Sequence, residues 1–520
     1  MPSELTKYDL VAYPGYTHPQ THPDRLAVIG SLFGLAPAPI TRCRVLELGC
    51  GNGTNLAPMA WALPNSEFVG IDLAGLPILQ GKQMVCDLGL ANLRLVHGDL
   101  AAVDAEWGQF DYILAHGVYS WVPVEVRTRL LEVCRQRLAP HGIAFVSYNA
   151  LPGCHLRAMV REMMLFHVAG CEAADERVQQ ARALVQFLAQ GQDTRDEYRL
   201  WMKAELERVL EHSPGHLYHD ELADINEPLY FTQFMQQASR HGLQYLGEAD
   251  CFEMSDQPFH DSVRQTLQQL AKNRLLREQY LDFLKCRRFR QTLLCQREAN
   301  LQTELQAEPI DRFLVSSAAV CPPGTLDLRP GINCVFATPK GVKCQTDLPL
   351  GKAALALLGS VWPLPMPFGE LLQQINQRLA QEGMLPESAD VSDSNLRAFL
   401  LRLYDGGAVE FRTSMPPIAL RSGERPVAHP VARWQAQHGD IAASLFHIAV
   451  KLEDEVARSL LTWLDGTRDR AALLEKLWLF LKSKDALVLP DGDEQAARRE
   501  LEANLEKNLE KLARLGLLAG

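Results

Sequence analysis

The chain has 520 residues, of which 47% are hydrophobic and 22% are charged, as in an ordinary soluble globular protein. A chain of this length exceeds what one hydrophobic core can hold, so we expect two to four domains. The net charge of −11 argues against broad binding to nucleic acid, because neutralising phosphates requires a basic face.

Signals for membranes, secretion and metals are missing from the sequence. No apolar run approaches the roughly 20 residues of a membrane-spanning helix, and the first residues lack the basic start and apolar stretch of a signal peptide. The 12 cysteines are scattered, without the spacing of a metal site. The sequence therefore predicts a cytoplasmic protein with no membrane span and no metal.

Residues 1–40 precede the first predicted strand and form an arm that is rich in tyrosine. A helix is predicted from Pro23, because apolar residues follow it at helical spacing. Ahead of this helix, Tyr8, Tyr13 and Tyr16 lie among prolines and a glycine. The arm is interpreted either as a loop that packs on the core or as a lid over a cationic ligand, since aromatic faces attract cations.

Residues 45–55 read Val-Leu-Glu-Leu-Gly-Cys-Gly-Asn-Gly-Thr-Asn, an apolar run with an acid and three alternating glycines. This pattern is typical of a buried strand, a tight turn and a helix start around a small ligand, because glycine permits left-handed backbone angles and close approach. A dinucleotide loop would have the spacing Gly-x-Gly-x-x-Gly and would bind pyrophosphate. Glu47 at the strand end would repel phosphate but suits a cationic or hydroxyl-rich ligand.

Four more strands follow, and three of them end beside polar or aromatic groups. They are predicted in residues 67–72, 93–100, 110–122 and 143–148. The second strand of the series ends in Asp72, the third ends in Gly98-Asp99, and the fourth opens into an aromatic loop. Strands that alternate with helical stretches indicate a parallel sheet, whose ligands bind beyond the carboxyl ends of the strands. A Rossmann-type dehydrogenase is the alternative interpretation.

The predicted core spans residues 41–152 and is interrupted by a helical insertion at 153–217. Residues 218–256 then contain a helix that ends at His241-Gly242 and a strand that starts at Leu243. This helix–glycine–strand pattern would supply the last strands of the sheet.

Three further units are predicted: a middle domain at 257–345, a winged-helix-like domain at 346–430 and a helical domain at 431–520. A winged helix often binds DNA, but its third helix here offers only two arginines, so nucleic acid is not the expected partner. The middle domain contains the densest basic cluster, Lys285, Arg287, Arg288 and Arg290. This cluster is interpreted as the solvated face of a helix or, alternatively, as a contact for an anion or substrate.

Several phrases carry a family resemblance. They are Tyr8-Asp9, Tyr13-Pro14, residues 20–26, 115–123, 147–153, 289–294 and 464–470, together with the glycine motif at 45–55. With them the chain resembles bacterial class I S-adenosylmethionine-dependent methyltransferases that carry a so-called regulatory domain, a group that includes rickettsial enzymes acting on lysines of outer-membrane proteins. The resemblance implies an α/β fold with a Rossmann-like methyltransferase core, a helical insertion used for dimerisation, a mixed α/β middle domain and winged-helix-like C-terminal domains.

The resemblance also implies S-adenosyl-L-methionine as the cofactor. Its predicted site is lined by Glu47, Gly49, Cys50, Gly51, Asp72, Leu73, Asp99, Leu100 and His116. The two carboxylate oxygens of Asp72 would accept the ribose hydroxyls, and Asp99 stands where the family recognises the adenine amine.

Tyr119 and Asn149 are the predicted catalytic residues. Tyr119, with Trp121, Tyr148 and the tyrosines of the arm, would form an aromatic pocket that favours a neutral amine by desolvation. Asn149 would accept the substrate amine or serve only as a turn residue. His219 and Asp220 would act as a proton acceptor or, alternatively, have a structural role.

The predicted function is a protein-lysine N-methyltransferase that acts as a homodimer. Two alternatives remain open from the sequence. One is a methyltransferase of small molecules or natural products, and the other is a cofactor-binding regulatory or scaffold protein without turnover.

Overall fold

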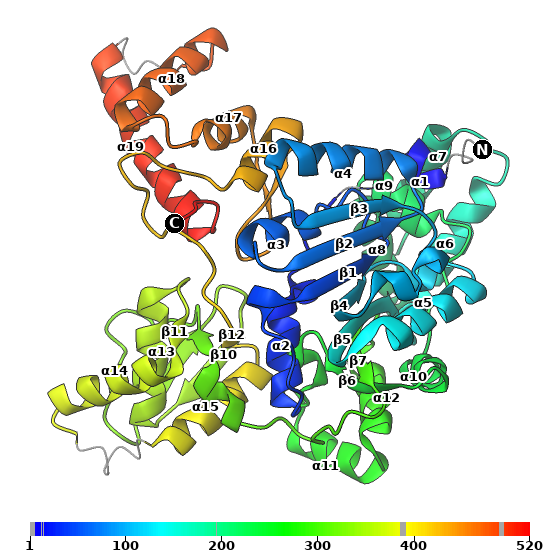
Figure 1. Ribbon diagram of the computed structural model, residues 1–520, viewed down its shortest axis with the longest axis horizontal. Coiled ribbons are helices and arrows are strands. Elements are labelled where there is room, and N and C mark those ends of the chain that lie inside the picture. Colours follow the sequence, from blue (N-terminus) through cyan, green and yellow to red (C-terminus); the bar gives the residue numbers. More distant parts are fainter. Residues whose placement is uncertain (1–5, 12, 14, 194, 385–391, 488–492) are drawn as a thin grey trace.

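A computed structural model describes residues 6–11, 13, 15–193, 195–384, 392–487 and 493–520. A seven-stranded sheet with the strand order β3-β2-β1-β4-β5-β7-β6 forms its centre (Figure 1). The strands are β1 (Arg44–Leu48), β2 (Glu67–Asp72), β3 (Leu93–His97), β4 (Phe110–Ala115), β5 (Leu138–Asn149), β6 (Leu243–Glu248) and β7 (Phe289–Gln296). The first five strands run parallel, and β7 is antiparallel to both β5 and β6. The predicted α/β fold with a Rossmann-like core is confirmed.

The central strands are buried on both faces, as parallel sheets usually are. Four consecutive residues from Val45 are buried in β1, and four from Tyr112 are buried in β4. The helices that pack on the sheet are α2 (Pro23–Leu32), α3 (Leu56–Ala62), α4 (Gly75–Leu88), α5 (Val124–Arg137) and α10 (Phe231–Arg240). Continuous apolar runs therefore marked these strands in the sequence, because both faces need apolar side chains.

The strand β7 corrects the prediction for the basic cluster. The sequence suggested a helix face in a separate middle domain, whereas residues 289–296 complete the methyltransferase sheet. Arg290 is 1% exposed, so it does not face solvent. It forms ion pairs with Glu248, Glu278 and Asp282, which compensate its charge inside the core. The core thus extends to residue 296, together with α11 (Asp261–Leu270) and α12 (Arg274–Lys285).

The helical insertion has a small apolar core of its own. It consists of α6 (His155–His167), α7 (Ala174–Gln190) and α8 (Glu197–Leu210). Val160, Ala181, Val185 and Leu206 are fully buried between these helices. The chain then returns to the sheet through α9 (Pro214–His216) and a π-helical turn, Leu217–Glu221.

The mixed α/β unit in the middle of the chain has different boundaries from those predicted. Its three-stranded sheet has the order β11-β8-β12, and β9 pairs with β10. The elements are β8 (Leu314–Ser316), β9 (Cys334–Ala337), β10 (Lys343–Thr346), α13 (Pro349–Val361), β11 (Met366–Pro367), α14 (Phe368–Gln381), α15 (Asp393–Asp405) and β12 (Glu410–Arg412). Because β8 lies between β11 and β12, one sheet joins residues that were predicted to belong to two domains, 257–345 and 346–430.

The last part of the chain combines helices with a β-hairpin. Its elements are α16 (Pro430–His438), β13 (Ile441–Ala443), β14 (Ala449–Lys451), α17 (Glu455–Trp463), α18 (Arg470–Ser483) and α19 (Glu494–Arg514). This C-terminal domain docks on the core through α16, where the indole Nε1 of Trp434 donates to Asp87 Oδ2 of α4 at 2.9 Å. Within the described ranges, no helix is long and apolar enough to cross a membrane.

Candidate cofactor and substrate site

The candidate site lies at the carboxyl ends of β1 and β4, where the strand order of the sheet reverses. β1 pairs with β2 on one side and with β4 on the other. The loops that follow β1 and β4 therefore lead in opposite directions. In an α/β sheet this divergence leaves the crevice in which ligands bind. Across the described chain, no group of three or more His, Cys, Asp or Glu side chains is placed to hold a metal ion.

The turn after β1 needs glycine for its backbone angles and for close packing. Gly49 has a φ of +76°, and a Cβ there would lie 2.5 Å from Val118 Cγ2. Gly51 has a φ of +53°, and a Cβ there would meet nothing within 4 Å. Its N–H donates to Asp72 Oδ2 at 2.7 Å. The turn is therefore packed on its Gly49 side and open at Gly51, where a ligand can approach the backbone.

Glu47 combines deep burial with an unused acceptor. Its side chain is 3% exposed, and Oε1 accepts a hydrogen bond from Asn55 Nδ2 at 2.8 Å. Oε2 is buried and has no hydrogen-bond partner among the described residues. Burial raises the pKa of this carboxyl to about 8, and the nearby charge of Asp72 adds to the rise. A cationic ligand would satisfy Oε2 and stabilise the ionised carboxylate.

Asp72 closes the glycine turn from the neighbouring strand. Besides the bond from Gly51, its Oδ1 accepts from the N–H of Ala74 at 2.8 Å. Burial raises the pKa of Asp72, although these two backbone hydrogen bonds oppose the rise. Cys50 lies in the glycine turn, close to Glu47 and Asp72. Its side chain is buried, so only its backbone can face a ligand.

The remaining predicted cofactor residues follow β2 and β3 at the same edge. Leu73 is 57% exposed directly after Asp72. Asp99 caps a short 3₁₀ turn at Leu100–Ala102, where its Oδ1 accepts from Ala101 N at 2.8 Å. The structure thus brings the predicted residues to one edge of the sheet, beyond β1, β2 and β3.

His116 follows β4 and meets the N-terminal arm. Its ring stacks on His18, with centroids 3.7 Å apart and an interplanar angle of 15°. Burial, together with the neighbouring His18, holds the pKa of His116 well below its usual range, so the ring is neutral. The arm therefore lies over the carboxyl edge of the sheet.

The tyrosines of the arm pack on the turn that carries His219. Tyr8 stacks on His219, and Tyr13 and Tyr16 both contact the ring of His216. The backbone oxygen of Val11 lies 2.7 Å from His219 Nε2. Burial, with the charges of Asp220 and Asp72 adding to it, raises the pKa of Tyr8 to about 12. Tyr8 therefore stands within electrostatic reach of both the β2 acid and the turn at Asp220.

Asn149 and Asp220 are linked by Asn226, a residue that sequence reasoning missed. Asn149 is 1% exposed, and its Nδ2 donates to Asn226 Oδ1 at 2.9 Å. Asn226 Nδ2 in turn donates to the backbone oxygen of Asp220 at 3.1 Å. Asn149 Oδ1 is buried without a hydrogen-bond partner in the described part of the chain. Only the position of Asn226 before Pro228 could have drawn attention to it.

Asp220 is a carboxyl poised to exchange a proton near neutral pH. Burial raises its pKa to about 7, and Glu221 adds to the rise, whereas Arg157 opposes it. General bases work best when their pKa lies near the operating pH.

Tyr119 and Tyr148 correct the prediction of the aromatic pocket. Both side chains are fully buried. The Tyr119 hydroxyl donates to Gln237 Oε1, and the Tyr148 hydroxyl lies 3.2 Å from Thr292 Oγ1. Both rings pack against Phe234 of α10. They therefore belong to the core, and Tyr119 does not line an open pocket in this structure. An aromatic loop after a strand does not reveal which way its rings turn.

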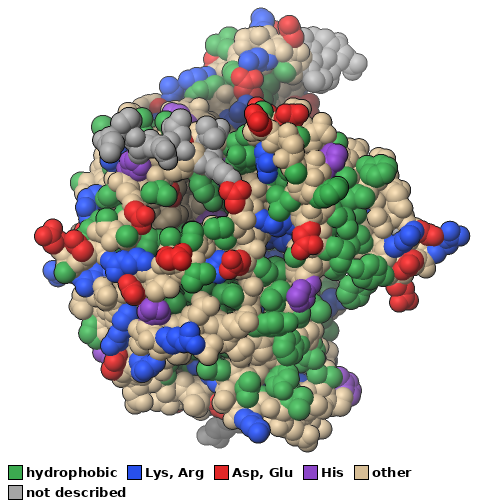
Figure 2. All heavy atoms as spheres, turned by 90° about the vertical axis from the view of Figure 1, so that its right-hand side faces the viewer, with side chains coloured by type: hydrophobic (Ala, Val, Ile, Leu, Met, Phe, Trp, Pro, Cys, Tyr) green, Lys and Arg blue, Asp and Glu red, His purple; other side chains and the backbone are tan. Residues whose placement is uncertain are grey.

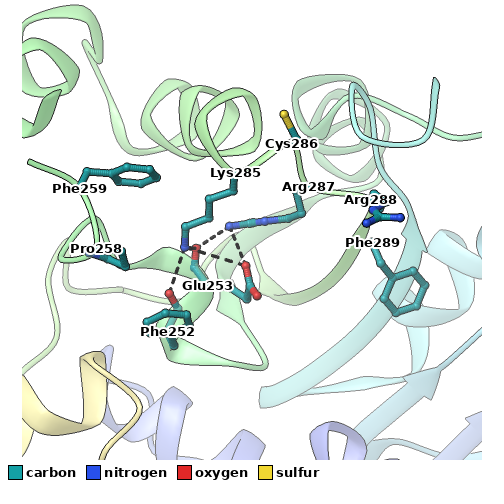
Figure 3. Close-up of a pocket in the computed structure, with 9 residues that line it drawn as sticks. All are labelled: Phe252, Glu253, Pro258, Phe259, Lys285, Cys286, Arg287, Arg288 and Phe289. Carbon is teal, nitrogen blue, oxygen red and sulfur yellow. Dashed lines mark hydrogen bonds and ion pairs between the residues drawn. The ribbon is translucent and has the colours of Figure 1, made fainter. Parts of the chain in front are cut away.

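The rest of the basic cluster lines a cavity of about 500 Å³ (Figure 3). Lys285 Nζ donates to the backbone oxygen of Glu253 at 2.7 Å, and Arg287 forms an ion pair with the Glu253 carboxylate at 3.3 Å. Phe289 lines the same cavity, and its ring centroid is 5.9 Å from that of His116. The cavity therefore adjoins the carboxyl edge of the sheet, and its charges are largely paired within the protein.

Comparison with known families supports the same architecture. Residues 45–142 match the family model described as a methyltransferase domain. Residues 213–296 match a predicted methyltransferase regulatory domain, and residues 424–517 match a PKMT C-terminal winged helix domain. The regulatory-domain match ends at the last residue of β7, so this segment includes the final strands of the sheet instead of residues 257–345.

One relative and one solved structure extend the match to 98% of the chain. The uncharacterised protein RP789 of Rickettsia prowazekii is 30% identical over 98% of this chain and 93% of its own length. A second protein of that organism, RP028, is 37% identical over 46% of this chain and 96% of its own length. The structure of PKMT2 from Rickettsia typhi in complex with AdoHcy is 28% identical, covers 98% of this chain and 100% of PKMT2, and has a TM-score of 0.86. The chain is an enzyme that belongs to the class I S-adenosylmethionine-dependent methyltransferases, in the group that carries the regulatory and PKMT winged-helix domains, and its cofactor is S-adenosyl-L-methionine.

Proposed function

We propose that the enzyme is a protein-lysine N-methyltransferase. The proposal rests on two observations. Asn149 Oδ1 is a buried acceptor without a hydrogen-bond partner among the described residues, and Asn149 is linked through Asn226 to the backbone of Asp220, whose carboxyl has a pKa raised to about 7. An amine needs both groups, one to orient an N–H and one to accept a proton. The similarity to PKMT2 and to the PKMT winged-helix model supports the same substrate class.

The cofactor would be held by the acids and backbone of the sheet edge. Glu47 Oε2 would accept from the ammonium of the cofactor's amino acid tail, Asp72 would accept from the ribose hydroxyls, and Asp99 would accept from the adenine amine. The orphaned oxygen of Glu47 and the open approach at Gly51 fit such a ligand. When bound, S-adenosyl-L-methionine supplies an activated methyl group on a sulfonium.

The protein has two tasks toward a lysine, which are to align it and to deprotonate it. Alignment matters because methyl transfer is an in-line displacement. The reference pKa of a lysine is about 10.4, and burial beside the arm would lower it by desolvation. Asn149 Oδ1 would then accept an N–H of the amine and direct its lone pair, and Asp220 would accept the departing proton.

His18 and His116 stack on each other at the site and are neutral, so they add no positive charge that would repel a cation. Burial lowers the pKa of His18 to about 4, and His116 is neutral for the same reason. The tyrosines of the arm offer aromatic faces, which attract an approaching ammonium. The site as a whole thus favours a cationic substrate over an anionic one.

The test is to incubate the purified chain with a methyl-labelled cofactor and a bacterial extract. Label should appear in protein and be recovered as methyl-lysine after acid hydrolysis. The Asn149→Ala variant should lose this label while it still binds the cofactor. Label confined to small molecules or RNA would exclude the proposal.

We also propose that the helical insertion forms a homodimer with a second copy of the chain. Large apolar side chains are exposed on its helices: Phe166 (86%), Phe187 (69%), Tyr198 (60%) and Trp201 (64%). Figure 2 shows hydrophobic side chains gathered on the side of the molecule that carries these helices in Figure 1. Exposed apolar patches often mark interfaces.

Light scattering tests the homodimer. The unmodified chain should give twice the monomer mass, and Trp201→Glu should give a monomer. A monomeric unmodified chain would contradict the proposal.

A further inference from the structure

The C-terminal domain reaches into the cofactor motif through His447. This residue lies in the loop between β13 and β14 and is 3% exposed. Its Nε2 is 2.8 Å from Oδ1 of Asn55, across 392 positions in sequence. Asn55 is the last residue of the glycine turn, directly before α3. The hairpin thus contacts the glycine turn at Asn55, the end of the same turn that is open toward a ligand at Gly51.

The side-chain amide of Asn55 uses all its hydrogen-bonding capacity, and its four bonds reach three parts of the site. Nδ2 donates to Glu47 Oε1 at 2.8 Å and to Thr21 Oγ1 at 3.0 Å. Oδ1 accepts from the backbone N–H of His18 at 3.0 Å and contacts His447 Nε2. A side-chain amide has two donor hydrogens and two acceptor lone pairs, so all four are engaged. The amide therefore ties together the β1 acid, the N-terminal arm and the C-terminal hairpin.

The chemistry of this network assigns the proton on His447. Because the backbone N–H of His18 can only donate, the amide atom of Asn55 that it meets is Oδ1, and this oxygen can only accept from His447. His447 must therefore carry its proton on Nε2. Burial, with His22, His18 and Arg412 nearby, holds the pKa of His447 well below its usual range, so the ring stays a neutral donor.

The backbone at His447 indicates that the position is held in place by its surroundings. Its φ is +63°, in the left-handed region that costs about 1 kcal/mol or more for a residue other than glycine. The loop is closed by Ser444, whose N–H donates to Ile448 O at 2.8 Å and whose oxygen accepts from His447 N at 2.8 Å. A glycine would adopt this angle more easily, so the contacts of His447 hold it here against a backbone cost.

Domain docking alone does not require His447 to reach Asn55. The hydrogen bond from Trp434 Nε1 to Asp87 Oδ2 joins the same two domains at a different place, away from the glycine turn. The two contacts therefore separate two roles. Trp434 holds the domain on α4, whereas His447 acts on the amide that holds Glu47.

We propose that His447 is a positioning residue for the cofactor, through which the C-terminal domain sets the affinity of the methyltransferase core for S-adenosyl-L-methionine. His447 fixes the orientation of the Asn55 amide, and Asn55 in turn holds Glu47 with its free oxygen toward the ligand. Without the donor from His447, Oδ1 of Asn55 loses one of its two partners in a buried site, and the amide can turn away from Glu47.

The test compares three variants of the full chain. Calorimetry measures the dissociation constant of S-adenosylhomocysteine, and steady-state kinetics separate KM for the cofactor from kcat. His447→Ala should weaken binding by about tenfold, the cost of a lost buried hydrogen bond, and raise KM while kcat changes little. His447→Gln, which keeps a side-chain donor, should restore most of the affinity. Trp434→Phe, which removes the docking hydrogen bond but keeps an aromatic ring, should bind like the unmodified chain.

A reciprocal measurement needs no variant. Because coupling between two sites is reciprocal, S-adenosylhomocysteine should slow hydrogen exchange of β13, β14 and the loop between them. Unchanged exchange there, or equal affinities of His447→Ala and the unmodified chain, would overturn the proposal. Equal losses in His447→Ala and Trp434→Phe would also overturn it, since docking alone would then account for the effect.

Discussion

Tyr8 lies flat against His219, with ring centroids 4.2 Å apart and an angle of 4° between the ring planes. One ring belongs to the N-terminal arm and the other to the π-helical turn after the insertion, so this stack joins segments far apart in sequence. The turn also carries Asp220. This contact therefore fixes the arm relative to the proposed proton acceptor. A change in the arm should alter how the substrate amine binds.

Removal of the Tyr8 ring should weaken substrate binding. We expect Tyr8→Ala to raise KM for the methylated protein by about 2- to 10-fold, because a stacked aromatic pair contributes about 0.5–1.5 kcal/mol. Tyr8→Phe keeps the ring and should behave like the unmodified enzyme. Initial rates of label transfer at varied substrate concentration measure the effect. An unchanged KM in Tyr8→Ala would show that the arm does not wall the substrate site.

Asp220 should give the reaction a pH dependence near neutrality. Its pKa is raised to about 7, so the carboxyl is protonated below that pH and cannot accept a proton from the substrate. We expect kcat to fall as pH drops through about 7, and Asp220→Asn to lower kcat by about 10²- to 10⁴-fold, the usual contribution of a general base.

The matched control for Asp220 is Asp224→Asn, which removes an equal charge from an exposed position nearby. This variant should keep both the rate and the pH profile. If Asp220→Asn retains the same break near pH 7, another group is responsible for it, and the assignment of Asp220 as the proton acceptor is refuted.

Glu47 should release a proton when the cofactor binds. In the empty site burial raises its pKa to about 8, so at pH 7 the carboxyl is mostly protonated. An ammonium at Oε2 would favour the ionised form, and the proton would leave to the buffer. Calorimetry of S-adenosylhomocysteine binding at pH 7, in buffers with different ionisation enthalpies, should show a proton release of up to one per site.

The Glu47→Gln variant tests the source of that proton. It keeps the size of the side chain but cannot ionise, so the buffer dependence of the binding enthalpy should disappear and the affinity should fall. If Glu47→Gln still releases the proton, Asp72 is the alternative source, because burial raises its pKa as well.

Features of the fold that depend on neighbouring residues could be predicted from the sequence. The strands predicted at Glu67–Asp72 and Leu243–Glu248 have these bounds in the structure. Each is an apolar run that ends in an acid, and such runs mark buried strands. The glycine turn at 49–53 was predictable for the same reason, since three alternating glycines have a local backbone requirement.

Features that depend on distant partners could not be predicted. β7 was missed because Arg290 makes its segment look solvated, and the acids that neutralise it lie up to 42 positions away. The side of the loop that Tyr119 faces is set by Phe234 and Gln237 of α10, which no local pattern relates to it. The contact of Asn55 with His447 joins two domains, and no sequence pattern around either residue predicts it.

The buried ion network around Arg290 gives the last prediction, which concerns stability. Arg290 Nη2 is 2.9 Å from Asp282 Oδ1 and 3.2 Å from Glu278 Oε2, and all three side chains are buried. Arg290→Ala would remove the ion pair of Glu248 and leave Asp282 and Glu278 to the longer ion pairs with Arg287. We therefore expect unfolding of the core to become easier by about 3–5 kcal/mol. Arg288→Ala breaks a half-exposed ion pair with Glu205 and should cost at most about 1 kcal/mol.

The loss in Arg290→Ala should depend on pH, and its sign follows from Asp282. Burial already raises the pKa of this carboxyl to about 6, although Arg290 opposes the rise. Without Arg290 the pKa in the folded state rises further above its unfolded value, so the folded variant binds a proton that the unfolded chain releases. The destabilisation should therefore be largest at and above neutral pH, and it should shrink as pH falls through the raised pKa of the variant toward about 6, the folded-state pKa in the unmodified chain. Urea unfolding at several pH values, followed by circular dichroism, measures this difference; a loss that stays constant with pH would mean that packing of the arginine stem, and not its charge, stabilises the core.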